Sequence, residues 1–322
     1  MRKGIAMRTG KRALRMYNKE LPMGSWNPAG TASLLCLALA LLWGTPHSAA
    51  GQAQPGINTS RAAQGAALSA EQVLADPGIL HRRLREKNPG YQGQAQFSFD
   101  PAMGLAGDFT GSRISDLSPL AGIPFGALDL RGQAVSNLKP LQGMPLKLLG
   151  IEDTLVADLT ALRGMKMEKL YLNNTPVSDL SPLAGMPLTE LMLVGTRVED
   201  LKALKVTPLQ SLWLNDTPVT DISPLAGCPL ISLTLEGTKV ADLKPLSKMT
   251  SLKRLHIGKT PVNDLTALKP LKLERLIFTP DNIRKGLDIA RNMKTITEVG
   301  ATLETRMPPE QFWPRFDQKK GE

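Results

Sequence analysis

A four-residue signature recurs eight times through the middle of the chain: an apolar residue, a variable residue, Asp (once Asn), then Leu or Ile. The intervals between copies are 21 residues six times and 22 once. The apolar anchors are Ile114, Val135, Val156, Val177, Val198, Val219, Val240 and Val262. A unit this short cannot enclose a core alone, so each must bury its apolar residues against its neighbours. The period therefore predicts a solenoid over residues 114–279.

The interior of each unit predicts what one turn of the solenoid contains. In the unit that starts at Val177, Leu191 and Leu193 alternate with a variable residue, which is the pattern of a short strand with one buried side. The residues left for the return are too few for an α-helix with two loops, so turns and 3₁₀ pieces are expected. The predicted fold class is α/β, with a curved parallel sheet on the concave side and short 3₁₀ helices on the convex side.

The return segment carries turn chemistry that repeats from unit to unit. Ser181 is predicted to cap a short helix, Pro182 to occupy its first position and Gly185 to allow the exit turn. Each repeated Asp is interpreted as a turn residue bonded to local backbone. A calcium ladder is the alternative, but alternating Asp-x-Asp ligands are missing. One Thr per unit, such as Thr196, is predicted to satisfy a buried backbone group.

This pattern resembles the leucine-rich repeat family, and within it the short internalin-type unit L-x-x-L-x-L-x-x-N-x-I-x-D-I-x-P-L-x-x-L. The matching residues are Leu188, Leu191, Leu193, Val177, Asp179, Leu180, Pro182, Leu183 and their equivalents over roughly residues 105–279. Thr stands where the family usually has Asn, and each unit is one residue shorter than the common form. The repeats also look like those of secreted bacterial proteins. The resemblance implies a binding protein that uses its concave face.

The N-terminus has the composition of an export signal. Its first 20 residues hold seven basic groups and one acid, an apolar stretch runs from Ala32 to Trp43, and small residues precede Gly51. Residues 1–50 are therefore predicted to be a signal peptide and the protein to be exported, to a periplasm or the cell exterior. The apolar stretch is short for a membrane anchor, which is the alternative, so no stable membrane span is expected.

Removal of residues 1–50 lowers the net charge of the chain and weakens the case for a nucleic-acid partner. The formal charge of +10 loses a net six and falls to about +4, and no basic stripe with aromatic residues remains, so no nucleic-acid partner is expected. Only Cys228 would survive cleavage, in a slot where other units have Met, and it is interpreted as a small core residue. An exported chain without a disulfide fits a bacterial periplasm or exterior.

The segments around the repeats are predicted to be a linker and two caps. Residues 51–68 read as a flexible linker. Residues 69–113 should form an N-terminal cap with a degenerate first coil: a helix over 69–87 interrupted at Pro77, then a strand pair between Tyr91 and Phe109. Residues 280–322 should form a C-terminal helical cap and tail. Three aromatic residues near Trp313 are interpreted as part of this cap, or alternatively as a partner motif.

Candidate binding residues follow from the strand pattern, because residues between and beside the strand leucines should line the concave face. Tyr171, Met192 and Trp213 are predicted to form an exposed row there, since adjacent strands lie about 4.8 Å apart. The alternative is that strand-favouring residues simply occupy a half-exposed sheet. The predicted ligand-binding residues are Tyr171, Asn173, Met192, Trp213, Asn215, Arg254 and His256.

Catalytic and phosphate-binding motifs are missing from the sequence, so no catalytic residue, metal or cofactor is expected. The prediction is a non-enzymatic, exported protein that binds another protein through its concave face. Two alternatives stay open. One is a cell-wall or glycan-binding module in which Tyr171 and Trp213 stack on sugar rings. The other is an envelope scaffold without a specific ligand.

Overall fold

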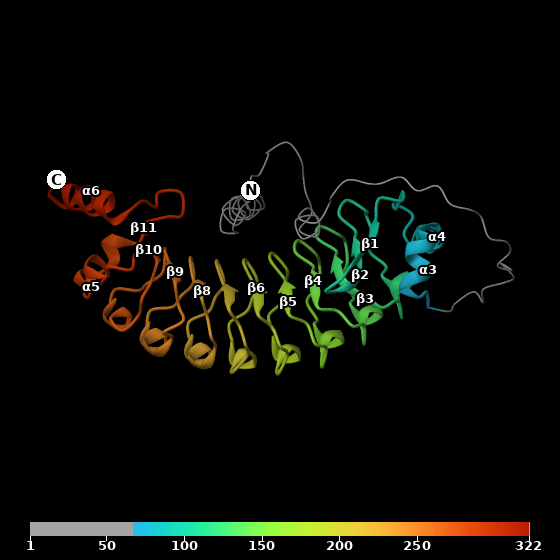
Figure 1. The fold of residues 1–322 in the computed structure, drawn as a ribbon, viewed down its shortest axis with the longest axis horizontal. Coiled ribbons are helices and arrows are strands. Elements are labelled where there is room, and N and C mark those ends of the chain that lie inside the picture. The colour runs from blue at the N-terminus through green and yellow to red at the C-terminus, as the bar shows by residue number, and fades with distance from the viewer. Residues whose placement is uncertain (1–66, 322) are drawn as a thin grey trace, which may run out of the picture.

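In the computed structural model, which describes residues 67–321, the chain forms an open arc built on one sheet of eleven strands (Figure 1). The strands follow each other in chain order; β1 and β2 pair antiparallel and all later pairs are parallel. They are β1 (Gln96–Asp100), β2 (Gly104–Asp108), β3 (Phe125–Asp129), β4 (Leu148–Gly150), β5 (Lys169–Tyr171), β6 (Glu190–Met192), β7 (Ser211–Trp213), β8 (Ser232–Thr234), β9 (Arg254–Ile257), β10 (Arg275–Phe278) and β11 (Glu298–Gly300).

Of the nine short 3₁₀ helices in residues 67–321, eight return the chain along the outer side of the arc, and the last directly follows β10 (Figure 1). The nine are η1 (Ser118–Leu120), η2 (Lys139–Leu141), η3 (Thr160–Leu162), η4 (Ser181–Leu183), η5 (Lys202–Leu204), η6 (Ser223–Gly227), η7 (Lys244–Lys248), η8 (Thr266–Leu268) and η9 (Pro280–Asn282). The predicted solenoid, with strands on the concave side and 3₁₀ turns on the convex side, is confirmed. The predicted signal peptide and nearly all of the predicted linker lie outside the described residues.

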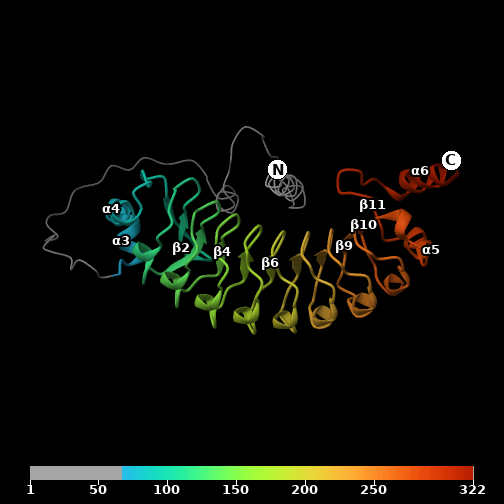
Figure 2. The same cartoon turned by 180° about the vertical axis from the view of Figure 1, so that it is seen from behind.

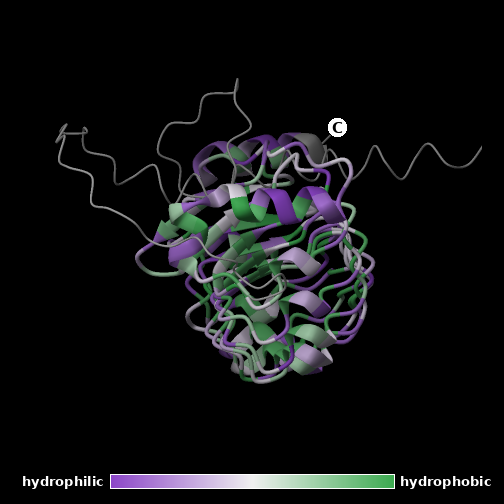
Figure 3. Cartoon of the chain, turned by 90° about the vertical axis from the view of Figure 1, so that its right-hand side faces the viewer, coloured by the Kyte–Doolittle hydropathy of each residue, from purple (hydrophilic) through white to green (hydrophobic). Residues whose placement is uncertain are grey.

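One continuous apolar core runs through the coils, because the leucines of each strand face inward. Leu188, Leu191 and Leu193 are fully buried, and the equivalent positions of the other coils join them in the same cluster. Viewed along the arc, the hydrophobic colour gathers at the centre of the coils (Figure 3). Cys228 is buried in this core as expected, and its Sγ donates to the Leu204 carbonyl oxygen at 3.3 Å.

The repeated Asp, and not the Ser that follows it, caps each 3₁₀ turn. Asp179 Oδ1 accepts from the Ser181 backbone N–H at 2.8 Å, and Ser181 Oγ donates to Asp179 Oδ2 at 2.8 Å. Leu180 holds the N-cap position, so the prediction that Ser181 caps the helix was wrong. An Asp two residues ahead of the turn reaches its first N–H, as in an Asx-turn. These hydrogen bonds hold the pKa of Asp179 below its usual value.

The same turn bond recurs around the arc, which confirms the interpretation of the repeated acids. The other acceptors are Asp116, Asn137, Asp158, Asp200, Asp221, Asp242 and Asp264. The threonines also behave as predicted: each hydroxyl donates to the carbonyl oxygen three residues earlier, at 2.6–2.7 Å. They are Thr154, Thr175, Thr196, Thr217, Thr238 and Thr260. Each coil thereby satisfies one more buried backbone acceptor.

A left-handed residue ends each strand turn. Gly195 takes φ +68°, and Asn174 one coil earlier takes φ +57°. A Cβ built on Gly195 would lie 2.7 Å from Asn174 Oδ1. Glycine is therefore favoured at this position, because it takes a positive φ without strain and leaves space for the neighbouring Asn174 amide.

The N-terminal end of the core is covered by α3 (Ala70–Ala75) and α4 (Pro77–Lys87). Ser69 and Gln72 form a capping box, and the helix breaks before Pro77 as predicted. Val73 of α3 and Leu80 and Leu84 of α4 are fully buried against the core. The β1–β2 hairpin follows, which matches the expected strand pair.

A buried asparagine, Asn88, joins this cap to the first coil. Its Oδ1 accepts from the backbone N–H groups of Ser115 (2.8 Å) and Asp116 (2.9 Å). Its Nδ2 donates to the carbonyl oxygens of Leu84 (3.2 Å) and Asp116 (3.0 Å). One side chain therefore connects the end of α4 with the start of the repeats.

The C-terminal end differs from the expectation. The segment expected to be a helical cap, residues 280–322, begins with the 3₁₀ helix η9 and, after Gly286 at φ +76°, continues with the short helix α5 (Leu287–Asn292). Strand β11, which lacks the repeat pattern, then extends the sheet. Helix α6 (Pro309–Gly321) packs Phe312 and Trp313 against Phe278, with ring centroids 6.2 Å and 6.4 Å away, and Phe316 packs on these two rings. Seen from behind, the two terminal groups of helices lie at opposite ends of the arc (Figure 2).

Candidate functional site

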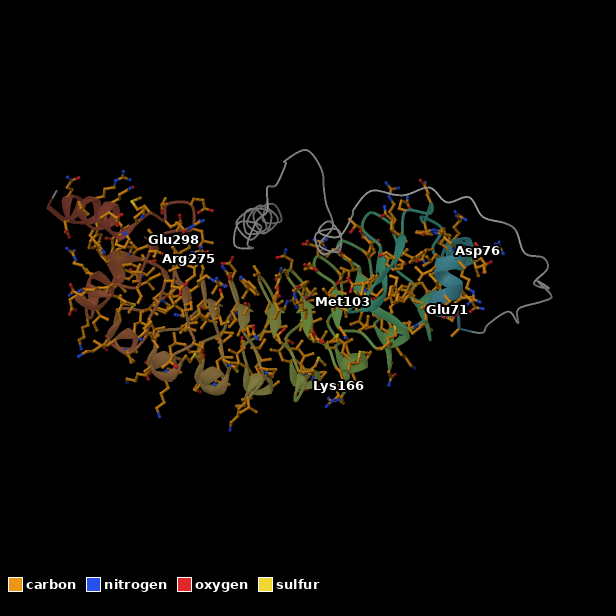
Figure 4. The ribbon with its side chains drawn as sticks, viewed as in Figure 1. Glu71, Asp76, Met103, Lys166, Arg275 and Glu298 are labelled. Carbon is orange, nitrogen blue, oxygen red and sulfur yellow. The ribbon has the colours of Figure 1, made fainter. Side chains whose placement is uncertain are left out.

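The concave face is organised in rows, because the parallel register places equivalent residues of successive strands side by side. The central row passes through the third residue of each strand from β5 to β8, and the register pairs its members in sequence. These members are Tyr171, Met192, Trp213 and Thr234, followed by His256 in β9. Figure 4 shows Met103 and the Arg275–Glu298 pair on the strand side of the arc and Lys166 on its outer side.

The middle of the face is an apolar cluster formed by Tyr171, Met192, Val194 and Trp213, with Leu148 packed against it. The structure brings together the three predicted row residues, but it does not leave them exposed. Tyr171, Met192 and Trp213 expose only 5%, 1% and 6% of their surface. Large side chains on strands about 4.8 Å apart cover one another, which the alternation pattern does not reveal. The expected exposed row is therefore a closely packed cluster on the face.

Polar contacts fix the edges of this cluster. The Tyr171 hydroxyl donates to Glu190 Oε1 at 3.1 Å, and burial, followed by the Glu190 charge, raises the pKa of Tyr171. Asn173 Oδ1 accepts from the Val194 backbone N–H at 3.0 Å, and its Nδ2 donates to Met192 Sδ at 3.7 Å. The Asn173 amide thus links two neighbouring coils from within the protein.

A second polar group lies toward the C-terminal end of the face. Lys259 Nζ donates to Glu236 Oε1 at 2.5 Å, and His256 Nε2 lies 3.6 Å from Glu236 Oε2. Asn215 Oδ1 accepts from the Thr234 hydroxyl, and Asn215 Nδ2 donates to Glu236 Oε2 at 3.5 Å. The Glu236 carboxylate is the common partner of Lys259, His256 and Asn215.

Exposure differs among the predicted residues at this end. His256 is buried, Asn215 is half-buried and Arg254 is exposed. The hydrogen bond to Glu236 raises the pKa of Lys259, whose ammonium group therefore remains a stable cation at neutral pH. Arg254 is the only exposed residue among the predicted site residues.

A third group, near the N-terminal end, was not among the predicted site residues. Arg131 Nη2 lies 2.7 Å from Asp129 Oδ2, and Arg131 Nε donates to Asp129 Oδ1 at 3.0 Å. Glu152 exposes 5% of its surface, and burial raises its pKa to about 8 while the nearby Arg131 charge lowers it. The signal in the sequence was Gly150, which interrupts the central row between Asp129 and Tyr171.

The described part of the concave face contains no candidate metal site. Within residues 67–321, no group of three or more His, Cys, Asp or Glu side chains is placed to hold a metal ion. In the same part of the chain, no helix has the length and apolar character needed to cross a membrane. The concave face instead offers a central apolar cluster between two groups of charged side chains.

The repeating strand, the 3₁₀ return and the Asp-capped turn define a leucine-rich repeat protein whose repeats are of the internalin type. Two solved structures from Listeria monocytogenes are similar to it. The internalin inlF is 27% identical with a TM-score of 0.54, and the match covers 58% of this chain and 58% of that one. The internalin C2 (inlC2) is 19% identical with a TM-score of 0.52, over 62% of this chain and 92% of that one.

These matches concern the fold of the repeats. The chain spans 58% of the length of the inlF chain. No protein-family model matches the sequence. No curated protein matches it either.

Proposed function

We propose that the chain is a non-enzymatic, exported protein that binds another protein through its concave face. The observation that carries this proposal is the composition of that face: one apolar cluster around Met192, with charged groups on both sides along the sheet. Solenoids of this kind use extended concave surfaces for binding. A protein surface, which presents apolar and charged groups together, complements such a face.

Burial of the aromatic rings favours a protein over a glycan. Stacking on a sugar requires an open ring face, yet Tyr171 and Trp213 expose 5% and 6% of their surface. The cluster therefore supports the centre of the concave face, and the exposed side chains around it would contact the partner protein first. Arg254, which is exposed on β9, is the strongest such candidate because Arg is enriched at binding hot spots.

A displayed library of random peptides, selected on the immobilised protein, tests the proposal. Arg254→Ala should weaken the selected peptides at least about fivefold, roughly 1 kcal/mol, as for an interface anchor. The matched control is Arg163→Ala, because Arg163 is exposed at the end of η3 on the convex side. Equal losses in both variants would show that the concave face is not the recognition surface. Failure to select any peptide would favour the scaffold alternative.

The N-terminal composition supports export. The basic segment, the apolar stretch from Ala32 to Trp43 and the small residues before Gly51 have the order of a cleavable signal. Mass spectrometry of the protein recovered from its native cells should find a mature N-terminus near Gly51, outside the cytoplasm. Recovery of intact residues 1–40 would contradict cleavage.

A further inference from the structure

The space over Gly150 is the feature of the concave face that the packing of the sheet does not explain. Gly150 pairs with Asp129 on one side and Tyr171 on the other, so it is the one position in this part of the row without a side chain. A Cβ built there would lie 3.0 Å from Glu152 Oε2 and 3.6 Å from Asp129 Oδ1. Two carboxyl groups therefore converge on the place that a side chain would fill.

The two acids are in different states. Asp129 is bound by Arg131 through both oxygens: Arg131 Nε lies 3.0 Å from Oδ1 and Nη2 lies 2.7 Å from Oδ2. Glu152 Oε2 is buried and has no hydrogen-bond partner among residues 67–321. Buried polar atoms in native proteins nearly always have a partner, and an exception calls for a reason.

The charges around this position are predominantly negative. The negative charges of Asp129 and Asp153 raise the pKa of Glu152. The negative charge of Asp108, in the adjoining coil, raises the pKa of Arg131. Arg131 is the cation recorded among these groups, and Asp129 already engages it. An additional positive charge would therefore be attracted to the space over Gly150, and a neutral or negative group would not.

We propose that Glu152 and Asp129 form a subsite for the cationic side chain of a protein partner, with Arg favoured over Lys, in the space left by Gly150. The subsite rests on the proposed function, since it assigns one contact of the concave face. The planar guanidinium group of Arg donates several hydrogen bonds in one plane and can bind a carboxylate in a bidentate manner. Binding requires the Glu152 carboxyl, which lies directly against the Gly150 backbone, to turn toward the concave opening.

Proton release accompanies this binding. The pKa of Glu152 is raised to about 8, chiefly by burial, so the free carboxyl is mostly protonated at neutral pH. A bound cation favours the ionised form, so its affinity should increase with pH up to about 8 and then level off. Arg131, Asp129 and Asp153 are the charged neighbours, and Tyr171 faces Glu152 from β5 with its pKa raised in the same environment.

The test uses a small probe and needs no partner. The full chain is titrated with n-butylguanidinium while amide NMR signals are followed, and the isosteric neutral compound n-butylurea is the reference. We expect saturable shifts at the amides of Gly150 and Glu152, and at least about tenfold weaker binding to Glu152→Gln, since a charge-assisted hydrogen bond is lost. Between pH 6 and 8 the affinity should rise with pH, while the probe stays charged throughout.

Two further variants complete the design. Gly150→Ala, which fills the space, should also weaken the probe, and its NMR spectrum reports whether the fold is retained. Glu298→Gln is the control, because that carboxylate is already paired with Arg275 and Arg306 at the far end of the face. Equal affinity for wild type and Glu152→Gln would overturn the subsite, and so would binding of n-butylurea as tight as that of n-butylguanidinium.

Failure of the subsite and failure of the proposed function give different results. Peptides that need Arg254 but show no enrichment of Arg or Lys would keep the concave face as the binding surface and overturn the subsite. Probe binding at Gly150 without any selected peptide would support the subsite and count against protein recognition by the rest of the face.

Discussion

Substitution of Asn88 by Ala should detach the N-terminal cap from the repeats. The change removes four hydrogen bonds, two to the backbone N–H groups of Ser115 and Asp116 and two to the carbonyl oxygens of Leu84 and Asp116. Each such bond contributes about 1 kcal/mol net. The Leu84 carbonyl keeps its bond from the Asn88 backbone N–H, and the other three bonds are only part-buried, so we expect a loss of roughly 2–4 kcal/mol.

The location of the loss is as informative as its size. Each coil contacts only its neighbours, so hydrogen exchange should accelerate most in α3, α4 and the first coil, and least near β9. Urea unfolding gives the total, and exchange followed by mass spectrometry gives the distribution. Asn137→Ala is the matched control: its Oδ1 accepts a single bond, from the Lys139 N–H at 2.9 Å in an exposed turn. Equal destabilisation by both substitutions, or a uniform change in exchange, would refute the role assigned to Asn88.

Three other substitutions test separate features. Because the pKa of Glu152 is raised from 4.5 to about 8, its carboxyl should lower stability as pH rises between these values, by at most about 1.4 kcal/mol per pH unit. Urea melts of Glu152→Gln should lose that slope, and an identical pH profile for both proteins would contradict the burial of this acid. Leu191→Ala removes a fully buried core side chain and should cost about 2–5 kcal/mol in unfolding free energy; an unchanged melt would refute the strand register. Gly195→Ala introduces strain at φ +68° against Asn174 and should lower stability by roughly 1–3 kcal/mol in the same assay, whereas a neutral effect would mean that the turn adapts.

The repeat pattern predicts the fold closely because one local rule is applied many times. The alternation of Leu191 and Leu193 places the strand, and a 21-residue period leaves room only for a 3₁₀ return. Where the pattern stops, prediction weakens: β11 has no leucine alternation, and it forms because the exposed edge of β10 accepts one more strand. The cap at Ser181 was misassigned because Ser and Asp are both good caps, and only geometry shows which one reaches the N–H.

The candidate site was harder to predict, since burial on the concave face depends on the size of side chains in neighbouring coils. Alternation places Met192 on that face, but its 1% exposure results from the rings of Tyr171 and Trp213 beside it. Glu152 was overlooked for a related reason. From the sequence, a Glu just after strand β4 is expected to be exposed to solvent, but the absence of a side chain at Gly150 allows its carboxyl to lie against the sheet.

Because all but one of the repeat intervals are 21 residues long, whole coils can be added or removed without disturbing their neighbours. Loss of the 21 codons for residues 177–197 would preserve every turn and bring Leu170 beside Leu212 in the core. On the face, Tyr171 would become the neighbour of Trp213, and Met192 would be removed. Unequal recombination between such similar segments could therefore lengthen, shorten or reorder the face in a single genetic step while the fold persists. A lineage of these proteins would be expected to differ in coil number before it differs in coil architecture.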